Sequence, residues 1–198
     1  MHLDDRQWAG LTLSLGTVEF AMGLTIAEIV YPDYSVSGNY ISDLGVGTAA
    51  APIFNGSIII LGLLLVLCSW FLFRGYRDRF LMVALAVAGV GAAGVGIFTE
   101  GSPFGLHSAF SLVTFVFAAL ATILAFRIVR PPLGYLSIVF GVASFAALGL
   151  YVSGNYLGLG TGGMERMIVW PVLVWGIAFG GYLLGAAAPS TTASKTTS

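Results

Sequence analysis

The sequence predicts an all-α integral membrane protein, a bundle of six membrane-spanning helices with both termini in the cytoplasm. Of its 198 residues, 58% are hydrophobic and only 9% are charged, whereas a soluble domain carries roughly 25% charged residues. The chain divides into apolar runs of roughly 20 residues or more, each long enough at about 1.5 Å per residue to cross a hydrocarbon layer of about 30 Å. Short links leave room for one domain, residues 1–186, and no second one.

The first predicted helix spans residues 8–31. An acidic start at Asp4 and Asp5 lacks the basic residues of a cleaved signal peptide, so we expect this span to be retained. Pro32 ends it, and the following link, residues 33–50, is rich in the turn-forming residues Gly, Ser, Asn and Asp. Pro52 then suits the first position of a second helix over residues 52–73.

A basic link, residues 74–79, leads into a third span over residues 80–99, where Gly91, Gly94 and Gly96 allow a neighbouring helix to approach closely. The fourth span covers residues 103–129 and ends before two consecutive prolines.

A fifth span covers residues 133–153, and a glycine-rich link separates it from a sixth over residues 164–186, with a bend expected at Pro171. Residues 187–198 are rich in Ser, Thr and Ala and predict a disordered cytoplasmic tail. The single cysteine, Cys68, lies inside an apolar run, so it forms no intrachain disulfide and is expected to fill space.

Positive charges fix the predicted orientation. With six spans, all but one of the cationic side chains fall on the side of the termini, which the positive-inside rule places in the cytoplasm of a plasma membrane. The exception is Arg166. The cations on the side of the termini are Arg6, Arg74, Arg77, Arg79, Arg127, Arg130 and Lys195.

The outer side, opposite the termini, gathers an unusual set of polar residues. Arg166 falls in the first turn of the predicted sixth helix, where the helix dipole disfavours a cation, so an anionic partner should lie close. Its candidates are Glu28, Asp43 and Glu100; the alternative is an arginine that extends into lipid headgroups. We expect one outer cluster, drawn from all three outer links, as a binding site. Its predicted members are Asp43, Glu100, His107, Glu165 and Arg166.

Two features inside the spans complete the candidate residues. His107, Ser111 and Thr114 share one face of the fourth helix, which either lines a pocket that opens outward or packs against a neighbour. Glu19 lies near the middle of the first span, where an unpaired charge is costly. We expect its carboxyl to be protonated or hydrogen-bonded and to face the bundle. Substitution by leucine would then leave the hydrogen-bond partner of Glu19 unsatisfied. The alternative is that Glu19 forms part of a proton or cation path.

Two outer links contain the same five-residue sequence, since residues 36–40 and 152–156 both read Val-Ser-Gly-Asn-Tyr. This repeat indicates either an internal duplication or two similar turns in which glycine supplies a positive φ. The sequence leaves both interpretations open.

The order of several short motifs resembles the prokaryotic membrane family called domain of unknown function 998 (DUF998). The resemblance implies a six-span bundle with polar groups on the outer side, and it implies no settled activity. The motifs are Ile41-Ser42-Asp43-Leu44-Gly45, Phe54-Asn55, Thr99-Glu100-Gly101 with His107, and Gly163-Met164-Glu165-Arg166.

Three classes of function remain open. The favoured interpretation is a binding or accessory component of the membrane. One alternative is an enzyme that acts on lipid headgroups through Glu100, His107 and Arg166. The other is a component of a permease for a small solute or ion. We expect no metal and no cofactor, because one outer histidine is too few for a metal centre and no span carries a histidine at depth for haem. The expected partners are membrane lipid and a membrane protein or second copy, and not nucleic acid.

Overall fold

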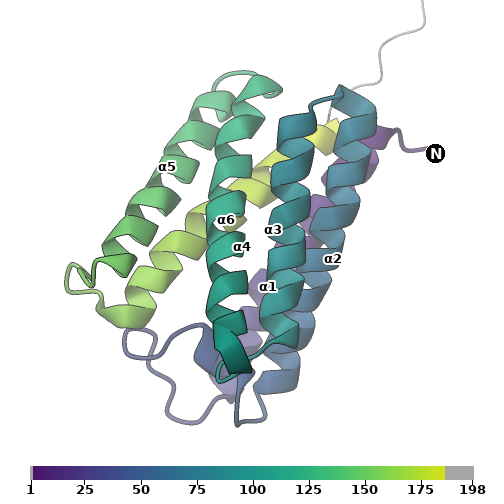
Figure 1. The fold of residues 1–198 in the computed structure, drawn as a ribbon. Coiled ribbons are helices and arrows are strands. Elements are labelled where there is room, and N and C mark those ends of the chain that lie inside the picture. Colours follow the sequence, from purple (N-terminus) through teal and green to yellow (C-terminus); the bar gives the residue numbers. More distant parts are fainter. Residues whose placement is uncertain (1, 186–198) are drawn as a thin grey trace, which may run out of the picture.

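A computed structural model describes residues 2–185 (Figure 1), and within that range it confirms the predicted class, an all-helical fold. Six of its helices are long and apolar enough to cross a membrane. The predicted tail, residues 187–198, lies outside the described residues. The long helices are α1 (Asp5–Val30), α2 (Ala51–Tyr76), α3 (Arg79–Ile97), α4 (Leu106–Leu124), α5 (Leu133–Val152) and α6 (Gly160–Gly185), and the 3₁₀ turns are η1 (Ser42–Gly45), η2 (Pro103–Gly105) and η3 (Ala125–Arg127).

Helices that follow one another in the chain pack side by side, and α6 returns to α1, so the bundle closes on itself (Figure 1). At the closing seam, Gln7 Nε2 donates a hydrogen bond of 3.5 Å to the carbonyl of Leu184. Both described ends of the chain therefore lie at one end of the bundle. We call the opposite end, which carries the links after α1, α3 and α5, the outer end.

Acidic caps begin two of the helices. Asp4 and Gln7 form a capping box in which Gln7 N donates to Asp4 Oδ1 and Asp4 N donates to Gln7 Oε1, so α1 begins at Asp5, ahead of the predicted residue 8. Asp78 caps α3 and also pairs with Arg127 at 2.8 Å. This pair fastens the start of α3 to η3, the turn that follows α4.

Glycines allow the close helix contacts, as the sequence predicts. A Cβ added to Gly62 would lie 2.5 Å from the carbonyl oxygen of Gly89, so α2 and α3 touch backbone to backbone. Gly91 and Gly94 face Thr114 and Phe110 of α4. Small residues bring helices together in lipid because burial from water offers no driving force there.

The sixth helix begins at Gly160, four residues before the predicted start at residue 164. The low helix propensity of glycine is the reason why the sequence predicts a link over residues 154–163. Packing overrides that preference, because Gly162 N donates to the carbonyl of Ser37 at 3.0 Å. Arg166 therefore lies in the second turn of α6, and the prediction that it lies in the first turn is wrong.

The repeated five-residue sequence Val-Ser-Gly-Asn-Tyr adopts two different turns. Gly154 has a φ of 73°, whereas Gly38 lies outside the left-handed region. Asn39 Oδ1 accepts from Ser35 N, four residues before it, but Asn155 Oδ1 accepts from Leu157 N, two residues after it. The identical residues therefore do not adopt the same backbone structure.

Candidate functional site

The link between α1 and α2 folds across the outer end of the bundle. We call residues 31–50 the cap segment. Ile41 and Leu44 within it are 4% and 0% exposed, so the segment inserts apolar side chains between the helices. From α2, Asn55 Nδ2 donates to the carbonyl of Gly45 at 2.9 Å and fixes the far end of the segment.

Arg166 is the main anchor of the cap segment. One terminal nitrogen, Nη2, donates to Glu28 Oε1 at 2.5 Å and to the Tyr34 hydroxyl at 2.6 Å. The other, Nη1, donates to the carbonyls of Val36 and Gly162, both at 3.0 Å. Among the candidate partners it is thus Glu28 that forms the ion pair. At 7% exposed, Arg166 does not extend into lipid headgroups, so that alternative is wrong.

The start of α6 holds the cap segment through its backbone as well. Thr161 Oγ1 donates to the carbonyl of Gly38 at 3.0 Å. A Cβ at Gly162 would overlap the carbonyl oxygen of Asn39, so only glycine permits this approach. The glycine-rich start of α6 is therefore a docking surface for the cap segment.

Glu165 and Asp43 order the middle of the cap segment. Glu165 Oε2 accepts from the backbone N–H of Ile41 at 2.6 Å, and the side chain is only 6% exposed. Asp43 Oδ2 accepts from Asn39 Nδ2 at 3.0 Å and from Tyr40 N at 2.9 Å. Two carboxylates thus satisfy backbone donors where the chain turns into η1.

Glu100 approaches the same turn from the link between α3 and α4. It accepts from Ser42 Oγ at 3.4 Å. Partial burial raises the pKa of Glu100, and the neighbouring Asp43 raises it further, while His107 and the Ser42 hydroxyl act in the opposite direction. Glu100 and Asp43 therefore form a pair of like charges at the rim of the outer end.

His107 is held separately at the start of α4. Its Nδ1 lies 2.9 Å from the carbonyl oxygen of Phe98, which can only accept, so Nδ1 carries the proton. Nε2 lies 3.5 Å from Ser111 Oγ. His107 therefore connects the end of α3 to the face of α4 that carries Ser111.

The five predicted cluster residues all lie at the outer end, but His107 contacts only α4 and the end of α3, and the contacts of the other four form two groups. Glu165, Asp43 and Glu100 act on residues 40–43 of the cap segment, and Arg166 acts on residues 34–36. Sequence reasoning missed Tyr34 and the backbone groups that Arg166 and Glu165 bind. The available signal for Tyr34 was its position in the link four residues after the end of α1, the helix that carries Glu28.

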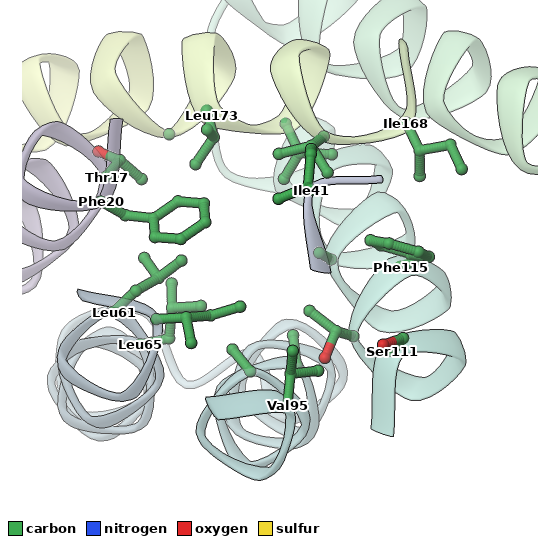
Figure 2. Close-up of a pocket in the computed structure, with 18 of the residues that line it drawn as sticks. Thr17, Phe20, Ile41, Leu61, Leu65, Val95, Ser111, Phe115, Ile168 and Leu173 are labelled. Atoms are coloured by element: carbon green, nitrogen blue, oxygen red, sulfur yellow. The ribbon is translucent and has the colours of Figure 1, made fainter. Parts of the chain in front are cut away.

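A central cavity of about 100 Å³ lies beneath the cap segment. Figure 2 shows Phe20 of α1, Leu61 of α2 and Val95 of α3 pointing into it, with Leu173 of α6 above them. An engineered apolar cavity of about 150 Å³ takes up benzene, so this space suits part of a small apolar molecule.

The polar atoms of this cavity are concentrated toward its outer end. Deeper hydroxyls are committed to backbone carbonyls, as with Thr17 on Leu13 and Thr114 on Phe110. Ser42 and Glu165 line the outer part, together with Ser111, which Figure 2 places beside Phe115. Ser111 and Thr114 thus line a pocket.

Glu19 is not among the residues that line the cavity. It is half-buried, its Oε2 has no exposed surface, and among residues 2–185 it has no hydrogen-bond partner. The expected hydrogen bond to Glu19 is therefore not found in the described part of the chain. No group of three or more His, Cys, Asp or Glu side chains that could hold a metal ion occurs among those residues either.

Comparisons with known proteins give a family and no close relative. A search of curated proteins and a search of solved structures each gave no match. A family model described as "Protein of unknown function (DUF998)" matches residues 14–182, from the third turn of α1 to the last turn of α6. This match covers most of the chain and includes the cap segment and every member of the outer cluster. The chain belongs to the DUF998 family.

Proposed function

We propose that this chain is a membrane-embedded binding protein whose central cavity receives the apolar part of a small amphipathic molecule. The observation that carries the proposal is the polarity of the cavity. Its walls are apolar, and its single carboxylate, Glu165, lies at the outer end beside Ser42. A ligand with an apolar body and a hydrogen-bond-donating or cationic end would match both parts.

Glu165 retains acceptor capacity for such a ligand. Its Oε2 accepts from Ile41 N, and no described residue donates a hydrogen bond to Oε1. Asp43 and Glu100 act on the same turn and add negative charge near the outer end. This field favours a cationic head such as a primary amine over a carboxylate.

The proposed location is the plasma membrane, with both termini in the cytoplasm and the cap segment outside. Support comes from the arginines, since six of the seven lie at the end of the bundle that holds the termini. Such an excess marks the cytoplasmic side. The outer cluster would then lie on the side of the cell exterior, and so would the polar end of the cavity, beneath the cap segment.

The enzyme alternative has less support from the contacts of Arg166. Four of the five N–H groups of its guanidinium donate to groups of the protein, which leaves little to hold a substrate phosphate. Glu100 accepts from Ser42, whereas His107 contacts Phe98 and Ser111, so no hydroxyl group of the described residues hydrogen-bonds to both of them. A permease component would need a path, whereas Ile41 closes the outer end of the cavity.

Tryptophan fluorescence tests the proposal. Trp175 lines the cavity and is 2% exposed, so bound bromooctylamine should quench its emission in a saturable way. The Trp175→Phe variant should lose this saturable component and keep the unsaturable quenching of Trp8, Trp70 and Trp170, which are exposed to lipid or detergent.

Two variants of α4 show whether the cavity is the site. Ala118 lines the cavity, so Ala118→Phe should abolish saturable quenching by filling the space. Ala109 lies on the exposed side of the same helix, and Ala109→Phe should leave the quenching unchanged. Equal saturable quenching in both variants would contradict binding in the cavity.

A further inference from the structure

Glu19 lies on the face of α1 that packs against α2. Gly16 and Gly23, one turn away on either side, both meet α2. A Cβ at Gly16 would lie 3.2 Å from Leu64 Cβ, and one at Gly23 would overlap Ser57 Oγ. Since residues three and four apart share a face of a helix, Glu19 lies between these two contacts. It occupies the seam between α1 and α2, half-buried and outside the cavity.

Two oxygens of this seam lack hydrogen-bond partners among the described residues. Glu19 Oε2 is fully covered and unpaired, and Ser57 Oγ, in a side chain that is 6% exposed, takes part in no hydrogen bond that the structure shows. Glu19 Oε1 and Ser57 Oγ both lie beside Gly23, within 4 Å of the point where its Cβ would be. The Ser57 hydroxyl can both donate and accept, so it is compatible with a neutral Glu19 carboxyl as its neighbour.

No countercharge faces Glu19 from the packed helices. The spanning part of α2, residues 51–73, contains one titratable side chain, Cys68, which lies level with Thr12 and thus about two turns farther in. On α6 the nearest charged residues, Glu165 and Arg166, are bound to the cap segment at the outer end. An isolated carboxylate in hydrocarbon is far costlier than a neutral carboxyl.

We propose that Glu19 is a proton-binding site of the membrane domain that hydrophobic reagents reach through the lipid-facing side of the α1–α2 seam. The ligand is a proton rather than a metal cation, because one carboxylate and one hydroxyl supply too few oxygens for a dehydrated metal ion. The site is separate from the cavity, so it does not depend on the binding function proposed above.

Dicyclohexylcarbodiimide, an apolar reagent, is the probe. Its reaction consumes a protonated carboxyl: the proton moves to one carbodiimide nitrogen, the carboxylate oxygen bonds to the central carbon, and nothing leaves. A later shift of the acyl group to nitrogen gives a stable N-acylurea that peptide mapping by mass spectrometry locates. Only a carboxyl that is protonated and open to the apolar phase reacts efficiently.

The experiment treats the full chain in lipid nanodiscs and maps the adduct. We expect the adduct at Glu19, a decline in labelling as the pH of the buffer rises, and a complete loss of this adduct in Glu19→Gln. Glu28 lies on the same helix but is paired with Arg166, so Glu28→Gln serves as the matched control and should leave labelling of Glu19 unchanged. Ser57→Ala should change the rate of labelling.

Three results would overturn the proposal. They are no adduct at Glu19, equal labelling of Glu19 by a water-soluble carbodiimide, and protection by sodium chloride at constant pH that potassium chloride does not give. The first would show that the carboxyl is closed to lipid or ionised, the second that it is open to water, and the third that the site takes a metal cation. Because Glu19→Gln keeps the shape of the side chain, a folding defect does not obscure these outcomes.

Discussion

The backbone N–H of Ile41 donates to Glu165 Oε2 over 2.6 Å, so the carboxylate at the outer end of the cavity holds the residue that closes it. One side chain of α6 therefore connects the cap segment to the space beneath. Its neighbour Arg166 fixes the preceding part of the cap segment through Tyr34 and Val36. The outer polar residues thus close this end of the bundle above the cavity.

Arg166→Ala should destabilise the protein by about 3 to 5 kcal/mol, because it leaves the Glu28 carboxylate without its partner in a partly buried place. The matched control is Arg130→Ala, at an exposed arginine of the opposite end, which should change the free energy of unfolding by less than about 0.5 kcal/mol. Thermal unfolding in detergent measures both. Equal losses would show that the Arg166 network does not stabilise the fold.

Gly162→Ala should destabilise the protein, because the added methyl group overlaps the carbonyl oxygen of Asn39 and pushes the cap segment off α6. Gly181 lies on the same helix with open space around its Cβ position, so Gly181→Ala should be neutral or stabilising by up to about 1 kcal/mol. Comparing the thermal unfolding of the two variants separates the effect of the contact with Asn39 from the effect of helix propensity. A tolerated Gly162→Ala would indicate that the cap segment is docked elsewhere.

Glu100→Gln should raise stability at alkaline pH relative to the wild type. In the folded protein the pKa of Glu100 is raised above its ordinary value of 4.5 by burial and by Asp43. Its contribution to stability is therefore fully present below that ordinary value and is lost as pH rises through the folded pKa. The melting temperature of the variant minus that of the wild type should increase from acidic to alkaline pH. A difference that is constant with pH would contradict this assignment.

Glu19→Leu should not destabilise the protein. The sequence predicted a loss because a buried partner would be stranded, but among the described residues Glu19 has no partner to strand. Leucine would instead remove a covered polar oxygen from the seam between α1 and α2. A loss of more than about 1 kcal/mol in thermal unfolding would mean that Glu19 forms a hydrogen bond after all.

The proposed orientation predicts opposite labelling of the two ends of α5. In a Cys68→Ala background, an impermeant thiol reagent added to intact cells should label Ser153→Cys, at the outer end, and not Arg130→Cys, at the other end. Both positions are exposed, so accessibility does not bias the comparison. Labelling of Arg130→Cys alone would place the termini outside the cell.

The helical fold was predictable because apolar length and composition alone set the number of spans. The early start of α6 was not, because the low helix propensity of its glycines is overridden by contacts with Ser37 and Asn39, more than a hundred residues earlier. The capping box of Asp4 and Gln7 was visible in the sequence as an acidic residue followed three positions later by a glutamine.

The candidate site was predictable only as a set of charges. The need of Arg166 for a carboxylate follows from its cost near a helix start, and Glu28 was one of three candidates. Which carboxylate pairs with it depends on how the cap segment folds, and that fold depends on backbone groups that no residue pattern encodes. The polar face with Ser111 and Thr114 predicted a pocket as one of two alternatives, but the shape of the cavity could not be predicted, since it is the space left where Phe20, Leu61 and Val95 approach from different helices.

A crystal structure of the protein with bromooctylamine, read by the anomalous signal of bromine, tests the proposed binding function most directly. We expect a bromine peak among Phe20, Leu65 and Leu61 in the cavity, with the amine within hydrogen-bond distance of Glu165. Two apolar grooves on the outside of the bundle, beside Val90 of α3 and beside Met22 of α1, are the competing positions. Bromine only in those grooves, with an empty cavity, would contradict binding in the cavity.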